Sequence, residues 1–188
     1  MASTFAAHRP CRRPAGISAG TLALPLALVL ALALAMFSFS CSSTKTSKEG
    51  GGAPDFALTS LDGQEVRLSQ FKGKVVILDF WATWCTPCKM ELPDFIDLYQ
   101  QFQNSGLVII GVSLDKTGVR EVASFVKEWK IPYIVVMGTG QVVRDYGGIR
   151  GVPTTFVIGK DGKIYKKYVG YRRKEVFQED VTKLLNAV

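Results

Sequence analysis

The sequence predicts an α/β domain in which a mixed β-sheet lies between helices. Two predominantly apolar runs, residues 75–81 and 107–113, are typical of strands that are covered on both faces. Segments with an apolar stripe at helical spacing alternate with these runs along the chain. Near the C-terminus, turn residues at 160–163 separate two further strand-like segments, which indicates an antiparallel hairpin added to the sheet.

The domain is expected to begin with a short hairpin. Asp62 and Gly63 form a turn signal between the segments 56–58 and 66–68. The first buried strand of the main sheet then follows at residues 75–81.

The middle of the domain is expected to alternate helices with strands. A helix is predicted over residues 86–102, because Pro87 suits a first turn and apolar residues recur at helical spacing. Pro93 predicts a kink in this helix. A second strand at 107–113 and a second helix at 119–129 follow, and parallel strands joined through a helix obey the right-handed crossover rule.

The last third of the chain ends the alternation. A strand is expected at 133–137 and a short helix at 141–146. The C-terminal hairpin pairs 155–158 with 164–169, and an amphipathic helix over 175–185 closes the domain. The order β-α-β-α-β-α-β-β-α predicts a mixed sheet between helices.

Residues 1–41 form a leader. It contains Arg9, Arg12 and Arg13, no acidic residue, and an apolar run over 19–39. This is the pattern of an export signal or of a single membrane anchor, and the arginines would keep the N-terminus on the cytoplasmic side. Either outcome tethers or delivers the domain outside the cytoplasm.

Cys41 stands at the end of the apolar run and resembles the lipidated cysteine of bacterial lipoproteins. That family prefers leucine three residues earlier, where this chain has Ser38. Lipidation at Cys41 and an uncleaved helix that spans the bilayer therefore remain alternatives. Cys11 precedes the apolar run and is assigned no role.

The rest of the chain divides into a linker and one domain. Residues 42–54 are rich in Ser, Thr, Lys and Gly and predict a flexible linker, and residues 55–188 have the usual length of a domain with a single core. Of the 23 basic residues three lie in the leader, so residues 42–188 carry a net charge of only +4. A nucleic-acid partner is therefore not expected.

The folded part contains no histidine, because His8 is the only histidine in the chain. Ser-His-Asp and Cys-His catalysis and histidine metal ligation are therefore excluded from the domain. Carboxylates, hydroxyls, lysines and cysteines remain available for chemistry.

Cys85 and Cys88 form a Cys-x-x-Cys motif between a buried strand and a helix. This spacing places the sulfurs one turn apart, with the first thiol at the positive end of the helix dipole, where a thiolate is favoured. A structural disulfide with so short a loop would constrain little of the unfolded chain, and structural zinc would need four ligands. A redox-active dithiol is the interpretation that the residues favour.

Residues 78–93 resemble the active-site segment of thioredoxin-fold proteins, and in particular the membrane-tethered TlpA/ResA/DsbE-like thiol-disulfide oxidoreductases of the AhpC/TSA-Redoxin superfamily. The resemblance covers residues 53–188 and includes a second motif at 151–154, just before the late hairpin. It implies a thioredoxin fold with a mixed central sheet flanked by helices, an N-terminal β-hairpin extension and an inserted helix. It implies no cofactor other than a redox-active Cys85–Cys88 disulfide.

The resemblance also implies a role for each residue of the site. Cys85, exposed at the helix N-terminus, would attack a substrate disulfide, and Cys88 would resolve the mixed disulfide. Trp84 would shield the sulfurs, the backbone at Val152 would pair with the substrate polypeptide, and Pro153 would have a cis peptide bond beside the disulfide. The residues expected to meet the substrate are Trp84, Thr86, Pro87, Val152 and Pro153.

Two carboxylates are candidates for proton transfer in a domain that lacks histidine. Asp79 lies in an otherwise apolar strand, where burial favours the neutral acid, so its pKa is expected to rise. It matches the buried acid of thioredoxins, where the TlpA/ResA group often has Asn. Glu91 follows Cys88 by three residues, which can place it near the active-site face, and it matches the family's Cys-x-x-Cys-x-x-Glu.

The leading hypothesis is an extracytoplasmic thiol-disulfide oxidoreductase that acts chiefly as a reductase of protein disulfides. The resemblance implies electrons from a membrane protein of the CcdA/DsbD type and, as a common substrate, the haem-binding Cys-x-x-Cys-His segment of apocytochrome c. The direction of the redox reaction stays open, because it depends on the reduction potential and on the partners.

Two other classes of function share the fold. Peroxiredoxins place their cysteine in a Pro-x-x-x-Thr/Ser-x-x-Cys context, but here residues 78–81 occupy the place of that proline and spacer. Sco-like copper carriers use Cys-x-x-x-Cys and a distant histidine, and this domain has neither. Assays of peroxide consumption and of copper binding distinguish these alternatives from the leading hypothesis.

Overall fold

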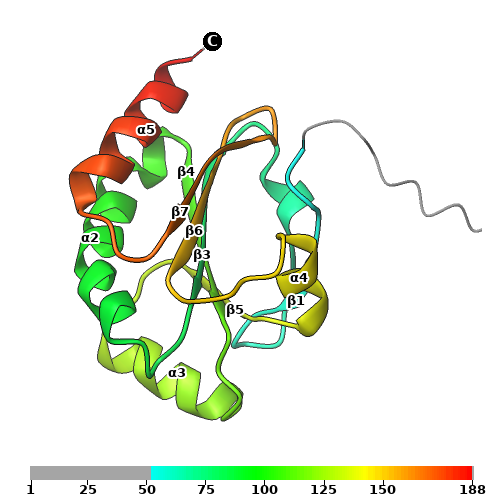
Figure 1. The fold of residues 1–188 in the computed structure, drawn as a ribbon. Helices are drawn as coiled ribbons and strands as arrows, with labels where there is room; N and C mark the ends of the chain where they lie inside the picture. The colour runs from blue at the N-terminus through cyan, green and yellow to red at the C-terminus, as the bar shows by residue number, and fades with distance from the viewer. Residues whose placement is uncertain (1–51, 188) are drawn as a thin grey trace, which may run out of the picture. The chain divides into compact units, whose positions relative to one another are not determined.

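The computed structural model describes residues 52–187, and Figure 1 shows their fold. The predictions for the leader, for Cys41 and for the first part of the linker lie outside these residues. At the C-terminal end of the predicted linker, residues 52–54, the chain is part of the folded domain, which differs from the prediction. Gly52 forms a β-bridge with Lys163, and the Ala53 N–H donates to the Gly162 carbonyl at 2.8 Å. The Pro54 carbonyl accepts from the Tyr146 hydroxyl at 2.8 Å, so residues 52–54 belong to the domain.

The predicted N-terminal hairpin is a separate two-stranded antiparallel sheet. Its strands are β1 (Ala57–Thr59) and β2 (Glu65–Arg67), and the short 3-10 helix η1 (Leu68–Phe71) follows. One side chain of each strand, Leu58 in β1 and Val66 in β2, points into the core, which is the alternation expected of a sheet with one buried face.

The main sheet has five strands in the order β5-β4-β3-β6-β7. Its central strand pairs in parallel with β4 and antiparallel with β6, so the sheet is mixed, as predicted. The strands are β3 (Val75–Trp81), β4 (Leu107–Ser113), β5 (Ile134–Met137), β6 (Thr154–Ile158) and β7 (Ile164–Val169). All seven residues of β3 are buried, because layers cover both faces of the sheet at this position.

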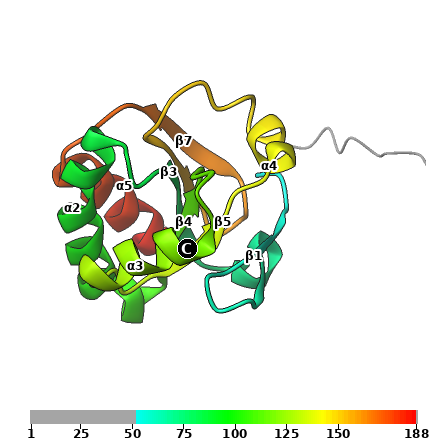
Figure 2. The ribbon, with the colours of Figure 1, turned by 90° about the horizontal axis from the view of Figure 1, so that it is seen from below.

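The helices and the N-terminal hairpin (β1 and β2) form two outer layers, one on each face of the main sheet. The helices are α2 (Thr86–Phe102), α3 (Val119–Glu128), α4 (Gly140–Asp145) and α5 (Lys174–Asn186), with the 3-10 helix η2 (Gln103–Ser105) after α2. Helices α2, α3 and α5 pack on one face in a single apolar cluster, whereas α4 and the hairpin pack on the other face (Figures 1 and 2). This arrangement is a thioredoxin-like fold, as the resemblance implied.

Helix α2 runs without interruption through Pro93. The proline has no N–H for the carbonyl one turn earlier, so the helix lacks one hydrogen bond at this point. Packing compensates for the missing bond, because Leu92, Phe95 and Leu98 are at most 2% exposed on the core side of the helix.

Among residues 52–187, no helix is long and apolar enough to cross a membrane.

Candidate active site

Cys85 and Cys88 form a disulfide at the N-terminus of α2. The S–S distance is 2.10 Å and the two Cα atoms are 5.3 Å apart. Cys85 is the N-cap of the helix, and its Sγ accepts a hydrogen bond from the Cys88 N–H at 3.2 Å. The first sulfur therefore lies at the positive end of the helix dipole, where a thiolate is stabilised.

The exposure of the two cysteines differs from the prediction. Cys85, expected to be exposed, is only 3% exposed, and Cys88 is 2% exposed. In the disulfide state both belong to the apolar cluster beneath α2 and α5, so the expectation of an exposed Cys85 is wrong for the oxidised protein. Trp84, the preceding residue, is 66% exposed and offers an apolar surface beside the pair.

The residues between the cysteines are turned outward. Thr86 is exposed and Pro87 is half-buried in the first turn of α2, where proline is well tolerated. Met90 is 57% exposed on the next turn. Trp84 and Thr86, next to Cys85 in the chain, form the exposed surroundings of the disulfide, and Met90 is a further exposed apolar side chain that sequence reasoning did not identify.

The motif before β6 lies at the same edge of the sheet as the disulfide. The Val152–Pro153 peptide bond is cis, as the resemblance implied. Thr154 pairs with Phe80 near the end of β3, so Pro153 lies beside the segment that leads to Cys85. Val152 packs against the cluster that contains both cysteines, and the Pro153 carbonyl accepts from the Gly170 N–H at 2.8 Å.

Asp79 is a buried carboxyl group on the cysteine side of the sheet. By the alternation of β3 its side chain shares a face with Ile77 and Trp81, which belong to the same cluster as the cysteines. Its Oδ1 accepts from the Thr155 hydroxyl at 3.1 Å, and the side chain is 4% exposed. Burial raises the pKa of Asp79 from 3.8 to about 7, as the sequence predicted in direction.

Glu91 is a second buried carboxyl group, 1% exposed and one turn after Cys88. Its Oε1 accepts from the Arg172 N–H at 2.6 Å, whereas its Oε2 is buried without a hydrogen-bond partner. Burial, followed by the negative charge of Asp79, raises the pKa of Glu91 to about 8. Glu91 is therefore a buried acid and not a solvated residue on the helix surface.

The two carboxyl groups lie near each other and near a third titratable side chain. The charge of Asp79 contributes to the raised pKa of Glu91, and burial together with both charges raises the pKa of Tyr133. Tyr133 packs in the same cluster as the cysteines. Sequence reasoning placed Tyr133 only in a strand, because nothing in its local pattern shows that the charges of the two carboxyl groups act on it.

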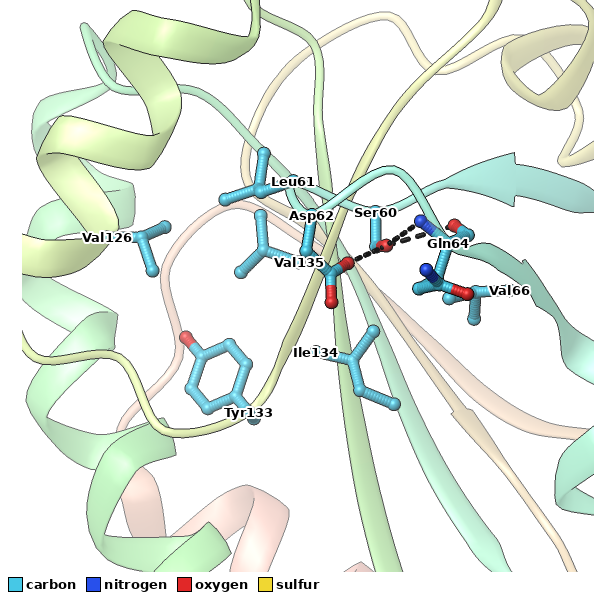
Figure 3. A pocket seen from close by; sticks show the side chains of 9 residues that line it. All are labelled: Ser60, Leu61, Asp62, Gln64, Val66, Val126, Tyr133, Ile134 and Val135. Atoms are coloured by element: carbon cyan, nitrogen blue, oxygen red, sulfur yellow. Dashed lines mark hydrogen bonds between the residues drawn. The ribbon is translucent and has the colours of Figure 1, made fainter.

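A separate cavity of about 360 Å³ lies between the hairpin loop, α3 and β5 (Figure 3). Leu61 and Asp62 of the loop, Val126 of α3 and Tyr133 are among its lining residues, and Figure 3 shows Asp62 hydrogen-bonded to Ser60. Its lining contains neither cysteine and none of the site residues predicted from the sequence. This cavity is therefore separate from the disulfide.

Comparison with known proteins identifies the family. Residues 50–167 match the AhpC/TSA family. The chain belongs to this family. The AhpC/TSA domain is similar to thiol-disulfide oxidoreductase ResA of Bacillus thuringiensis subsp. konkukian (strain 97-27), with 38% identity over 136 residues, 72% of this chain and 78% of the relative. It is also 38% identical to ResA of Bacillus subtilis (strain 168) over 122 residues, 65% of this chain and 68% of the relative.

Solved structures agree with the thioredoxin-like fold. A thiol:disulfide interchange protein of the thioredoxin family from Chlorobium tepidum TLS superposes with a TM-score of 0.67 at 33% identity, over 72% of this chain and 96% of that one. StoA from Bacillus subtilis superposes with a TM-score of 0.59 at 28% identity, over 69% and 98%. With its cysteine pair in this fold, the protein is a ResA/DsbE-like protein-disulfide oxidoreductase.

Proposed function

We propose that this AhpC/TSA family protein is a reductase of protein disulfides that works outside the cytoplasm. The observation that carries the proposed direction is the pair of buried carboxyl groups, Asp79 and Glu91, on the cysteine side of the sheet. At pH 7 Asp79, with its pKa of about 7, is about half ionised, and its negative charge near the dithiol disfavours the thiolate form. The reduced state is then less stable, and the pair gives up its electrons more readily.

The proposed reaction uses each site residue at a stated atom. The Cys85 thiolate attacks a substrate sulfur, an S–S bond forms between the two proteins, and the first substrate thiolate leaves. Cys88 then loses its proton to the carboxylate of Asp79 or Glu91 and attacks the Cys85 sulfur. The second substrate thiolate leaves, so two electrons have passed to the substrate and the Cys85–Cys88 disulfide has formed.

The exposed surroundings of the disulfide are proposed to hold the substrate. Trp84 and Thr86 offer exposed surface on the helix side, and Pro87 shapes the loop between the cysteines. Backbone groups at Val152 are proposed to pair with an extended substrate segment beside Pro153. A polypeptide bound in this way would bring its disulfide to the N-terminus of α2.

The reduction potential of the Cys85–Cys88 pair tests the direction. We expect about −270 mV or below for the full-length chain equilibrated with dithiothreitol buffers, with the pair quantified by mass spectrometry so that Cys11 and Cys41 do not contribute. A value near about −120 mV, which is the potential of a strong oxidant, would contradict the proposal that the protein acts as a reductase.

A disulfide-bonded Cys-x-x-Cys-His peptide tests the proposed substrate, the haem-binding segment of apocytochrome c. We expect the reduced full-length chain to reduce this peptide about tenfold faster than a peptide of the same composition with scrambled positions, because positioning of the substrate beside the disulfide adds to the chemistry. Equal rates for both peptides would show a general reductase and remove the cytochrome assignment.

The leader supports the proposed location and the electron source. Its apolar run follows three arginines, so export or anchoring would place the domain outside the cytoplasm, tethered by lipid on Cys41 or by an uncleaved helix. Disulfides form readily in that compartment. A reductase there needs electrons from the cytoplasm, and a membrane protein of the CcdA/DsbD type is proposed to deliver them.

A further inference from the structure

The turn that carries Cys85 leaves backbone donors without a partner inside the turn. The Cys85 N–H donates to the Ala82 carbonyl at 3.1 Å, so Thr83 and Trp84 occupy the central positions. In such a turn the N–H of the first central residue points outward. A half-buried N–H of this kind needs an acceptor from another part of the chain.

Asp115, 32 residues away in sequence, provides this acceptor. Its Oδ2 accepts from the Thr83 N–H at 3.0 Å, and its Oδ1 lies 3.3 Å from the same nitrogen. Oδ1 also accepts from the Thr83 hydroxyl at 2.6 Å. The carboxyl group thus holds Thr83 by its backbone and by its side chain at once.

Asp115 is itself fixed to the sheet. It is 8% exposed, its Oδ2 accepts from the Ser113 hydroxyl at 2.8 Å, and its N–H donates back to that hydroxyl at 3.2 Å. Ser113 is the fully buried last residue of β4, and its carbonyl accepts from the Gly138 N–H at 2.8 Å. The Leu114 N–H donates to the Trp81 carbonyl at 2.9 Å, which joins the ends of β3 and β4.

We propose that Asp115 is a positioning residue of the thiol-disulfide reaction. Its carboxylate holds Thr83, and through Thr83 it fixes the turn that places the Cys85 sulfur over the Cys88 N–H and the N-terminus of α2. The inference rests on the thiol-disulfide exchange in the proposed function and is independent of the direction, the substrate and the cellular location. Positioning the Cys85 sulfur at the N-terminus of α2 favours its thiolate. The negative charge of Asp115 alone would disfavour the thiolate, because a carboxylate disfavours a nearby thiolate.

The Thr83→Val substitution tests this role, because it removes one hydroxyl while keeping the side-chain shape and the charge of Asp115. In the reduced full-length chain we expect the pH profile of Cys85 alkylation to move up by about one pH unit, which is a roughly tenfold slower reaction below the midpoint. The kcat/KM for disulfide exchange falls by about tenfold as well. Thr83→Ser keeps the hydroxyl and should restore the wild-type profile.

A double-mutant cycle links the effect to Asp115. If Asp115 acts through Thr83, Thr83→Val causes no further displacement of the pH profile in the Asp115→Asn background. Alkylation is followed for the Cys85 peptide by mass spectrometry. Thr139→Val, which removes the N-cap hydroxyl of α4 on the other face of the sheet, is the matched control. It should lower the melting temperature and leave the Cys85 profile unchanged.

Three results would overturn the proposal. They are an unchanged profile in Thr83→Val, a profile equally displaced in Thr83→Val and Thr83→Ser, and a displacement of the same size with and without Asp115→Asn. Failure of the proposed function is distinct, because it would appear in the wild-type chain as absent disulfide exchange, whatever the variants do.

Discussion

Replacing Cys88 with serine is expected to abolish turnover and to leave the protein covalently joined to its substrate through Cys85. In the proposed reaction Cys85 attacks first, because it is the N-cap of α2 and its sulfur lies at the positive end of the helix. Without the Cys88 thiol, nothing resolves the mixed disulfide. Turnover should fall to the rate of uncatalysed exchange, and the joined species should accumulate under non-reducing conditions.

The reciprocal variant decides the order of attack. Cys85→Ser should also lack turnover but should form no stable mixed disulfide, and Ser43→Ala in the linker is a control outside the site. The experiment is informative because the oxidised structure does not distinguish the cysteines by exposure, at 3% and 2%. A mixed disulfide on Cys88 in the Cys85→Ser variant would reverse the assigned roles. Mass spectrometry of the joined peptides identifies the cysteine involved.

The strands and helices of this domain were predictable because each has a strong local pattern. The apolar run of β3 and the proline at the start of α2 are visible in a few residues. Element ends were less predictable where tertiary contacts set them. Helix α5 begins at Lys174, one residue before the expected start, and the N–H of Lys174 donates to Asp94 in α2 at 3.1 Å.

The site was predictable to the extent that its chemistry lies in short motifs. Cys85, Cys88 and Pro153 stand in such motifs, and Asp79 is conspicuous in an apolar strand. The partner of each carboxyl group was not predictable, because sheet register and loop packing decide it. Glu91 meets the backbone of Arg172 across 81 residues.

Two further features of the site depend on the closed three-dimensional arrangement. Asp115 follows a strand end with no motif around it, and only the pairing of β3 with β4 brings it to Thr83. The burial of Cys85 arises from packing against the cluster beneath α2, whereas the motif alone indicates an accessible thiol. Local sequence thus identifies the reacting atoms, and long-range contacts determine their surroundings.

The oxidised protein is expected to be less stable at pH 8 than at pH 5, because of the buried acids Asp79 and Glu91. In the unfolded chain Asp79 ionises near 3.8, whereas in the folded protein its pKa is about 7. Between these values the unfolded state has lost a proton that the folded state keeps, so the free energy of unfolding falls as the pH rises from about 4 to about 7. The rise in pKa corresponds to roughly 4 kcal/mol once both states are ionised. Glu91, whose pKa is raised to about 8, changes stability in the same direction.

The Asp79→Asn substitution separates the contribution of Asp79 to the pH dependence of stability from that of other groups. It also tests the role of Asp79 in the thiol-disulfide reaction. The amide stays neutral and can still accept from Thr155, so the variant should exceed the unfolding free energy of the wild type by roughly 2 kcal/mol at pH 5 and by up to roughly 4 kcal/mol at pH 8. Denaturant unfolding of the oxidised full-length chain at both pH values measures this, with exposed Asp145→Asn on α4 as the matched control. No histidine of the domain titrates in this range, because His8 lies in the leader.

The same variant should turn over more slowly, since it lacks a carboxylate to take the Cys88 proton. Unchanged stability at pH 8 would contradict the raised pKa, and unchanged turnover would remove Asp79 from the proton transfer. A gain in stability with a loss of rate would show that the domain keeps a costly buried acid for its chemistry.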